Sequence, residues 1–153
     1  MKVCIGGTFD PLHKGHKTLL RKACEIAGNQ GKVFIGITEG ELIKGKQLVC
    51  SFEKRKKKIQ KFLSTIQGTC TIQVQPIYDI FGPTLEQDFD AIIISSESKK
   101  NAEIINKQRI TRGKKSLQII EIPLVLADDH LPIRSSRIKH HEIDTEGKIL
   151  YHN

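Results

Sequence analysis

Short apolar runs alternate with helix-like stretches along the whole chain, and this alternation restricts the fold more than any other feature of the sequence. We expect strands over residues 2–6, 32–38, 71–78, 91–94 and 117–125, and helices over residues 15–28, 51–66, 99–112 and 135–141. The run Ala91–Ile94 is apolar without interruption, which is typical of a strand buried on both faces. Strands that alternate with helices favour a parallel sheet between two layers of helices.

The predicted fold is a single Rossmann-like α/β domain, with a central five-stranded parallel sheet and helices on both faces. At 153 residues the chain is long enough for one domain with a substantial core, spanning residues 1–153. We expect the polar segment 142–153 to form a peripheral tail. The chain has no run of about 18 apolar residues and no signal-peptide pattern, so we expect a cytoplasmic protein without a membrane partner.

The net charge favours polyanionic partners. Lys and Arg number 25 against 17 Asp and Glu, which gives a formal net charge of +8. Such a charge suits nucleic acid or phosphorylated small molecules. Aromatic residues make up only 5% of the chain and Trp is absent, so side chains on which single-stranded bases could stack are scarce. We therefore expect phosphorylated metabolites as ligands and no nucleic acid.

The basic run 54–58 also has a structural interpretation. Arg55 lies three residues after Phe52 and four before Ile59, on the apolar face of the predicted helix. An arginine that points inward needs an anionic partner, whereas the neighbouring lysines are expected to form a solvated face. The four cysteines do not have metal-ligand spacing, so we expect no metal site held by the protein.

Ligands of open parallel sheets bind beyond the carboxyl ends of the strands. That rule brings together five segments, one after each predicted strand, and they are the most charged and Gly- or Ser-rich parts of the chain. They are Gly6–His16, Glu39–Lys46, Asp79–Pro83, Ser95–Ser98 and Asp128–Arg137. The sequence therefore predicts one ligand site at this edge of the sheet.

The first of these segments has the features of a phosphate site. Gly6 and Gly7 let backbone N–H groups approach a ligand closely, and the helix that follows contributes a partial positive charge at its start. His13 and His16 lie three residues apart at the mouth of that helix, so both can face a ligand there. Beside phosphates we expect both imidazoles to be protonated.

Two further segments supply charge for phosphates. Lys44 and Lys46 lie in the loop after the second strand, where an ammonium would neutralise phosphate oxygens, and we favour Lys44. Ser135, Ser136 and Arg137 open the last helix, where hydroxyls and backbone N–H groups would form a second phosphate cradle.

Several of these segments resemble motifs of a known superfamily. His13-Lys14-Gly15-His16 resembles the HxGH signature of the nucleotidyltransferases, which move a nucleotidyl group from a nucleoside triphosphate onto a phosphate. Ile133–Arg137 resembles their closing Ile-Ser-Ser-Thr-Arg type motif, with Arg134 in place of the first serine. More narrowly, the chain resembles the archaeal and eukaryotic type of phosphopantetheine adenylyltransferase. That resemblance covers nearly the whole domain and rests on Gly6–His16, Asp79–Pro83, Ser95–Ser98, Asn101–Arg109 and Ile133–Arg137. Ser98 stands where threonine is common.

The resemblance implies transfer of AMP from ATP to the phosphate of 4′-phosphopantetheine, with His16, His13 and Lys44 as the catalytic residues. The residues implied to bind ATP are Gly6, Gly7, Thr8, Phe9, His13, His16, Ser96, Glu97, Ser135, Ser136 and Arg137. Those implied to bind the acceptor are Thr8, Asp10, Lys44, Asp79 and Arg55. Mg²⁺ would arrive on the ATP phosphates, since no carboxylate cage is evident.

Other activities remain open at this point. The same fold and site would suit a cytidylyltransferase for glycerol or ethanolamine phosphate, although the Arg-Thr-x-Gly-Ile-Ser-Thr type ending of those enzymes is absent. They would also suit an adenylyltransferase for a flavin or nicotinamide mononucleotide. A non-catalytic RNA-binding domain is the alternative from another class, motivated by the net charge and the run 54–58. The sequence leaves the oligomeric state open, a monomer included.

Overall fold

The computed structural model describes residues 1–66, 68 and 70–151. Its centre is one sheet of five parallel strands, in the spatial order β3-β2-β1-β4-β5. The strands are β1 Lys2–Gly7, β2 Lys32–Thr38, β3 Thr71–Ile77, β4 Ala91–Ile94 and β5 Gln118–Glu121. The predicted five-stranded parallel sheet is confirmed.

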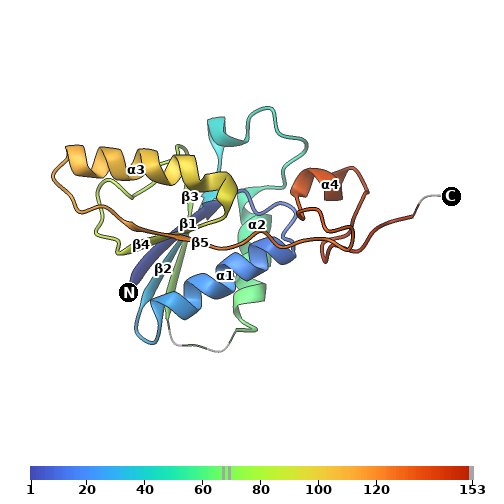
Figure 1. Ribbon diagram of the computed structural model, residues 1–153, viewed down its shortest axis with the longest axis horizontal. Helices are drawn as coiled ribbons and strands as arrows, with labels where there is room; N and C mark the ends of the chain where they lie inside the picture. The colour runs from blue at the N-terminus through green and yellow to red at the C-terminus, as the bar shows by residue number, and fades with distance from the viewer. Residues whose placement is uncertain (67, 69, 152–153) are drawn as a thin grey trace.

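Helices cover both faces of this sheet, as predicted. In Figure 1 the sheet is seen nearly edge-on, with α3 on one side of it and α1 and α2 on the other. The helices are α1 Lys14–Ala27, α2 Phe52–Leu63, α3 Lys99–Thr111 and the short α4 Ser135–Lys139, with 3₁₀ turns η1 Gly40–Ile43 and η2 Ser96–Ser98. Among the described residues, no helix has the length and apolar character needed to cross a membrane.

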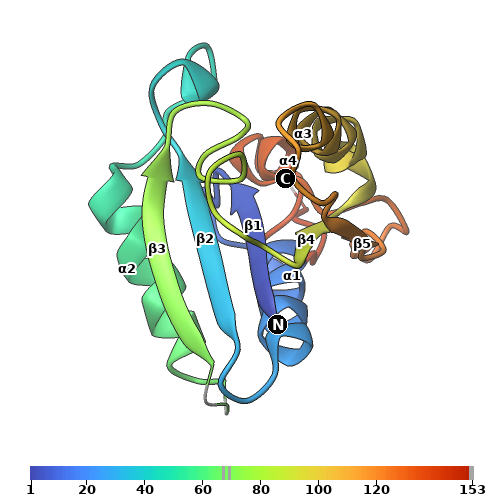
Figure 2. The ribbon, with the colours of Figure 1, turned by 90° about the vertical axis from the view of Figure 1, so that its left-hand side faces the viewer.

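The order in which strands are added to the sheet reverses at β1, between β1 and β4. The chain passes from β1 outward to β2 and β3, then returns to place β4 on the other side of β1. No helix accompanies that return; Figure 2 shows the segment between β3 and β4 passing in front of the sheet. In sheets of this kind the crevice for a ligand opens where the strand order reverses, at the carboxyl ends of the strands.

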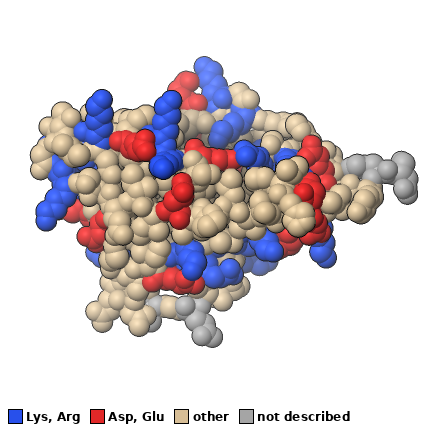
Figure 3. Space-filling view, viewed as in Figure 1, with Lys and Arg blue, Asp and Glu red and all other residues tan. Residues whose placement is uncertain are grey.

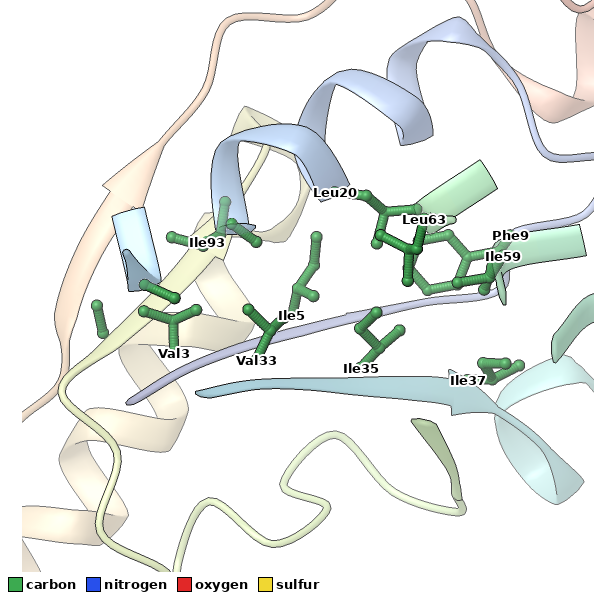
Figure 4. Packing of buried hydrophobic residues seen from close by; sticks show 13 residues of the cluster. Val3, Ile5, Phe9, Leu20, Val33, Ile35, Ile37, Ile59, Leu63 and Ile93 are labelled. Atoms are coloured by element: carbon green, nitrogen blue, oxygen red, sulfur yellow. The ribbon is translucent and has the colours of Figure 1, made fainter. Parts of the chain in front are cut away.

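Alternation along each strand divides the core between the two faces. Val3 and Ile5 of β1 pack with Leu20, Ile35 and Ile59 beneath α1 and α2, as Figure 4 shows. Their neighbour Cys4 faces the opposite side, in a second cluster with Phe34, Phe89, Ile92, Ile94, Ala102, Ile105 and Leu117 beneath α3. This period of two fixes the register, because a one-residue slip would expose one face of the core.

Two expectations about the C-terminal third are wrong. β5 ends at Glu121 instead of residue 125, because Pro123 cannot donate to a strand ladder. The segment 142–151 is packed and is not a peripheral tail: Ile143 is 1% exposed and packs with Ala127 and Ile133. The Thr145 carbonyl also accepts a hydrogen bond of 2.9 Å from the backbone N–H of Lys14, at the start of α1. The rest of the expected tail, residues 152–153, lies outside the described residues.

Candidate active site

A cavity of about 720 Å³ opens at the carboxyl ends of the strands, over the point where the strand order reverses. The segments after all five strands contribute to its lining, as predicted. A volume of this size is typical of sites for small molecules, where apolar walls and a few convergent polar groups fix a ligand.

The two histidines at the start of α1 cap the helix for each other. His13 is the N-cap, and its Nδ1 accepts hydrogen bonds from the backbone N–H groups of Gly15 (3.0 Å) and His16 (3.3 Å). In return, His16 Nδ1 accepts from the backbone N–H of His13 at 3.3 Å. The rings stack with their centroids 3.6 Å apart. This is a capping box in which two imidazoles replace the usual hydroxyl and carboxylate.

Small and apolar neighbours hold this pair of rings in place. A Cβ on Gly15 would lie 2.9 Å from Cε1 of His13, so a larger residue there would displace the ring. Phe9 is buried and packs its ring 5.2 Å from that of His16, with the same ring lying against Gly7. The glycine between the histidines and the phenylalanine before them therefore position both rings at the cavity wall.

Both histidines are neutral in this arrangement. Burial lowers the pKa of His13 to about 4. Burial, and then the neighbouring His13, lower the pKa of His16 to about 3 against an opposing hydrogen bond with the Pro11 backbone. An imidazolium carries a proton on both nitrogens, whereas each Nδ1 here accepts hydrogen bonds. The proton of each neutral ring therefore resides on Nε2, and protonation of the rings beside bound phosphates stays a prediction.

The structure brings Lys46, and not the favoured Lys44, to the cavity. Lys46 Nζ donates a hydrogen bond of 2.7 Å to Oγ1 of Thr8, whose hydroxyl also shares a 2.7 Å hydrogen bond with that of Thr38. Burial, followed by the charges of Lys139 and Arg55, lowers the pKa of Lys46. Lys44 points outward with its side chain 74% exposed, 3.8 Å from Glu41. The predicted loop therefore contributes to the cavity through Lys46, whereas Lys44 is not among the lining residues.

Lys139 is a cavity residue that the sequence analysis missed. It lines the cavity with Ser135 and Ser136, and its Nζ donates to the Gln47 carbonyl at 2.7 Å, which joins α4 to the loop after β2. Helical spacing could have found it, since Lys139 lies four residues after Ser135 and three after Ser136, on the same face of the helix.

Arg137, which was expected to bind phosphate, braces its own segment outside the cavity. It donates to Asp129, to Glu142 (3.0 Å) and to the Pro132 carbonyl (3.0 Å). The hydrogen bonds that it donates to Asp129 and then to Glu142 raise the pKa of Arg137. Its guanidinium is thus engaged by the turn that precedes α4 and the turn that follows it.

Arg134, at the N-cap of α4, pairs with Glu97 across the mouth of the cavity. This ion pair connects the segment after β4 to the segment after β5. Both partners of the ion pair are about half exposed.

Of the serines in the segment after β4, Ser95 and Ser98 also line the cavity, whereas Ser96, which was expected to bind ATP, is exposed outside it.

The two carboxylates that were expected to bind the acceptor have partners within the chain. Asp10 lines the cavity, buried, and its Oδ2 accepts from the backbone N–H of Cys50 at 2.7 Å. Asp79 lies outside the cavity, and its Oδ1 accepts from the backbone of its own turn at Phe81 (3.0 Å) and Gly82 (2.9 Å).

Arg55 points inward, as its place on the apolar face predicted, and is 1% exposed. It pairs with Glu39 and donates to the carbonyls of Cys50 (2.9 Å) and Thr38 (2.8 Å), beneath the loop that bears Lys46. Its anionic partner is therefore a residue of this chain, and the guanidinium secures the loop from below.

Similarity to known proteins agrees with this site. A family model described as cytidylyltransferase-like matches residues 4–141, which include the histidine motif and α4. A phosphopantetheine adenylyltransferase of Methanosarcina mazei is 41% identical over 149 residues, covering 97% of this chain and 96% of its own. One from Archaeoglobus fulgidus is 34% identical and covers 98% of this chain and 100% of its own.

Solved structures share the fold. A protein of unknown function from Archaeoglobus fulgidus has a TM-score of 0.71 at 31% identity, covering 80% of this chain and 89% of its own. A tyrosyl-tRNA synthetase from the same organism, with a TM-score of 0.61 at 12% identity, covers 89% of this chain and 59% of its own, and this likeness concerns the fold alone. Matched by the family model over most of its length and by full-length relatives, the chain belongs to the cytidylyltransferase-like family and, within it, to the phosphopantetheine adenylyltransferases.

Proposed function

We propose that this protein transfers AMP from ATP to the phosphate of 4′-phosphopantetheine, giving dephospho-coenzyme A and pyrophosphate, a step of coenzyme A biosynthesis. The observation that carries the proposal is the convergence of His13, His16, Thr8 and Lys46 on one cavity. The family and the names of the full-length relatives support the same activity.

The histidine motif and α4 form the nucleotide end of the cavity. With its Nδ1 occupied by the backbone, His13 has its Nε2–H available as a donor to phosphate oxygens. His16 lines the same cavity, and a phosphate would replace the Pro11 backbone as the partner of its ring. Ser135, Ser136 and Lys139 face the same cavity from α4 and would hold the outer phosphates. Donors fixed in this way need no reorganisation when charge develops in the transition state.

The acceptor phosphate is assigned to Thr8 and Lys46. Their hydrogen bond places an ammonium and a hydroxyl side by side beside the glycines of β1. The cavity then continues beneath α3, between apolar side chains that include Phe34, Ile92 and Ile105. A phosphate joined to a long arm with apolar segments fits this combination of a charged end and apolar walls.

The reaction needs positioning and charge stabilisation rather than an enzyme nucleophile. An oxygen of the acceptor phosphate attacks the α-phosphorus of ATP in line, the new P–O bond forms, and the bond to the β-phosphate oxygen breaks to release pyrophosphate. Lys46 orients the attacking phosphate and the histidines bind the oxygens on which charge accumulates. Alignment of the two reactants and electrostatic stabilisation supply the acceleration.

Mg²⁺ is assigned to the nucleotide and not to the protein. The described residues contain no group of three or more His, Cys, Asp or Glu side chains placed to hold a metal ion. The two acids at the cavity are already engaged, Asp10 with the Cys50 backbone and Glu97 with Arg134. The ion would therefore accompany the triphosphate as its counter-ion.

Pyrophosphate release tests this proposal directly. The protein with Mg²⁺ is given ATP and 4′-phosphopantetheine, beside parallel mixtures of CTP with glycerol phosphate, CTP with ethanolamine phosphate, and ATP with flavin or nicotinamide mononucleotide. Release only in the first mixture is the expected result. Turnover only in another mixture would keep the site and overturn the substrate assignment.

RNA binding is the remaining alternative. Figure 3 shows Lys and Arg interspersed with Asp and Glu over the face it displays, which gives no single basic patch there. Steeply salt-dependent RNA binding without any pyrophosphate release would favour this alternative over catalysis.

A further inference from the structure

The Thr84 side chain lacks a partner in the interior of the protein. Thr84 is 5% exposed, and among the described residues its Oγ1 is the one buried side-chain N or O atom without a hydrogen bond. It lies in the segment between β3 and β4 and lines the cavity. Buried polar groups are satisfied in nearly all native structures, so an unsatisfied one at a cavity wall calls for an explanation.

The backbone around Thr84 is held firmly, so the hydroxyl cannot readily move to find a partner. Arg109, buried in the last turn of α3, donates to the carbonyls of Thr84 and Gln87 (3.0 Å) and, through Nε, to that of Lys115 (2.8 Å). The Thr84 N–H donates to the Phe81 carbonyl at 2.9 Å. A β-branched side chain on a fixed backbone has few rotamers.

Thr84 lines the same cavity as the apolar side chains beneath α3. Arg109 fixes it beside the last turn of α3, where the segment after Thr84 leads back to the amino end of β4. The cavity walls beneath α3 are apolar and include Phe34, Ile92 and Ile105. A hydroxyl in such surroundings is costly unless a ligand group pairs with it.

Resting on the proposed function, we propose that Thr84 Oγ1 hydrogen-bonds an amide in the arm of the acceptor and so determines acceptor specificity. The arm of 4′-phosphopantetheine carries amide groups between short apolar segments, and a threonine hydroxyl can donate to an amide oxygen or accept from an amide N–H. Sites that hydrogen-bond a substrate group discriminate strongly against analogues that lack the group.

Substitution Thr84→Val tests the assignment, because valine keeps the shape and removes the hydroxyl. The KM for 4′-phosphopantetheine should rise about tenfold, the loss expected for one hydrogen bond, while kcat and the KM for ATP stay within about twofold. Thr84→Ser restores the hydroxyl and should restore most of the affinity. 4-Phosphopantoate, which has the phosphate but no amide, should bind wild type and T84V with equal affinity in calorimetry.

A second measurement, thermal denaturation of the ligand-free protein, tests whether the Thr84 hydroxyl lacks a partner. Because T84V removes an unpaired buried polar group, the Tm of the ligand-free protein should rise, and a fall in Tm would overturn the assignment. A wild type that turns over 4′-phosphopantetheine while T84V shows an unchanged KM would overturn it as well. Absence of turnover by wild type would instead overturn the proposed function, and this assignment with it.

Discussion

The histidine side of the cavity (His13 and His16) and the lysine side (Lys46 and Lys139) differ in how the chain builds them. The histidines come from one turn, are fixed by hydrogen bonds to its backbone, and pack on Phe9. The lysines come from separate segments, and the contact that joins those segments, Lys139 to Gln47, spans 92 positions of sequence and is exposed. The first side is rigid because of local structure, whereas the second depends on how distant segments meet.

Because of this difference, we expect the two sides of the cavity to have different roles in the reaction. A rigid pair of donors suits the stabilisation of a transition state, where small displacements are costly. Long side chains on exposed loops suit the capture of phosphates, because they can adjust as a ligand binds. Substitutions on the histidine side should therefore act mainly on kcat, and those on the lysine side mainly on KM.

The largest effect is expected for His16→Ala. Removing one fixed donor to the developing charge should lower kcat about 100- to 1000-fold, measured as pyrophosphate release at saturating ATP and acceptor. A kcat within about tenfold of wild type would contradict the role of His16.

The control for that variant separates catalysis from helix capping. His16→Gln keeps an acceptor for the His13 N–H, as in an ordinary capping box, and should keep the wild-type Tm. If H16A and H16Q lose activity equally while only H16A loses stability, the imidazole acts in catalysis and not only as a cap.

Lys46→Ala should have the next largest effect. Losing a charge-assisted contact to the acceptor phosphate should lower kcat/KM for the acceptor about 10- to 100-fold, mostly through KM. Lys44→Ala is the matched control: two positions away, with an exposed side chain, it should leave kcat/KM within about twofold. Equal losses in the two variants would show that the loop acts through its charge as a whole.

The pH dependence of stability should come from the histidine side. The pKa values of His13 and His16 are about 4 and about 3 in the folded protein, below the value of about 6.5 in unfolded chains. At a pH between the folded and the unfolded pKa values, the unfolded state binds more protons than the folded state. The free energy of unfolding is therefore highest above about pH 6.5 and falls as the pH drops towards 4.

The double variant His13→Asn, His16→Gln keeps both caps and removes both titrations. Its Tm should fall less than that of wild type between pH 7 and pH 5, measured by thermal denaturation. Parallel curves for the two proteins would contradict the proposed neutral, buried state of the rings.

The smallest effect is expected at the mouth of the cavity. The Arg134–Glu97 ion pair is about half exposed, so Arg134→Ser should raise the KM for ATP by no more than about fivefold, and less at high salt. Exchanging the charges, with R134E and E97R together, should return KM towards wild type if the pair acts as a clasp. Failure of the exchange would indicate that Arg134 contacts the nucleotide itself.

Features that depend on local structure could be predicted from the sequence, whereas those that depend on contacts between distant segments could not. The strands, the helices and the histidine motif depend on local patterns, and each lies close to where it was expected, apart from the end of β5, which stops at Glu121. Lys44 and Lys46 are equivalent locally, and only contact of Lys46 with Thr8, 38 positions away, distinguishes them. Arg137 and Lys139 lie on different faces of the short helix α4, and it is the face of Lys139, shared with Ser135 and Ser136, that lines the cavity.

Partners distant in sequence were beyond prediction. The inward face of Arg55 was readable from Phe52 and Ile59, but its pairing with Glu39 requires the fold. The unpartnered hydroxyl of Thr84 has no sequence signal at all, since burial and hydrogen bonding at that point depend on Arg109 from α3. Ile143, one apolar residue in a polar segment, likewise gave no indication that it would be covered.

The packed segment after α4 sets a limit on how short an active fragment can be. The backbone of Thr145 supplies a partner to the first turn of α1, one residue after the N-cap His13, and Ile143 closes the small cluster beside α4. A fragment that ends at the last residue of α4, Lys139, would lack supports of both the histidines and α4. A minimal unit for expression or fusion should therefore extend to about residue 150, where the Leu150 N–H still donates to the Glu142 carbonyl.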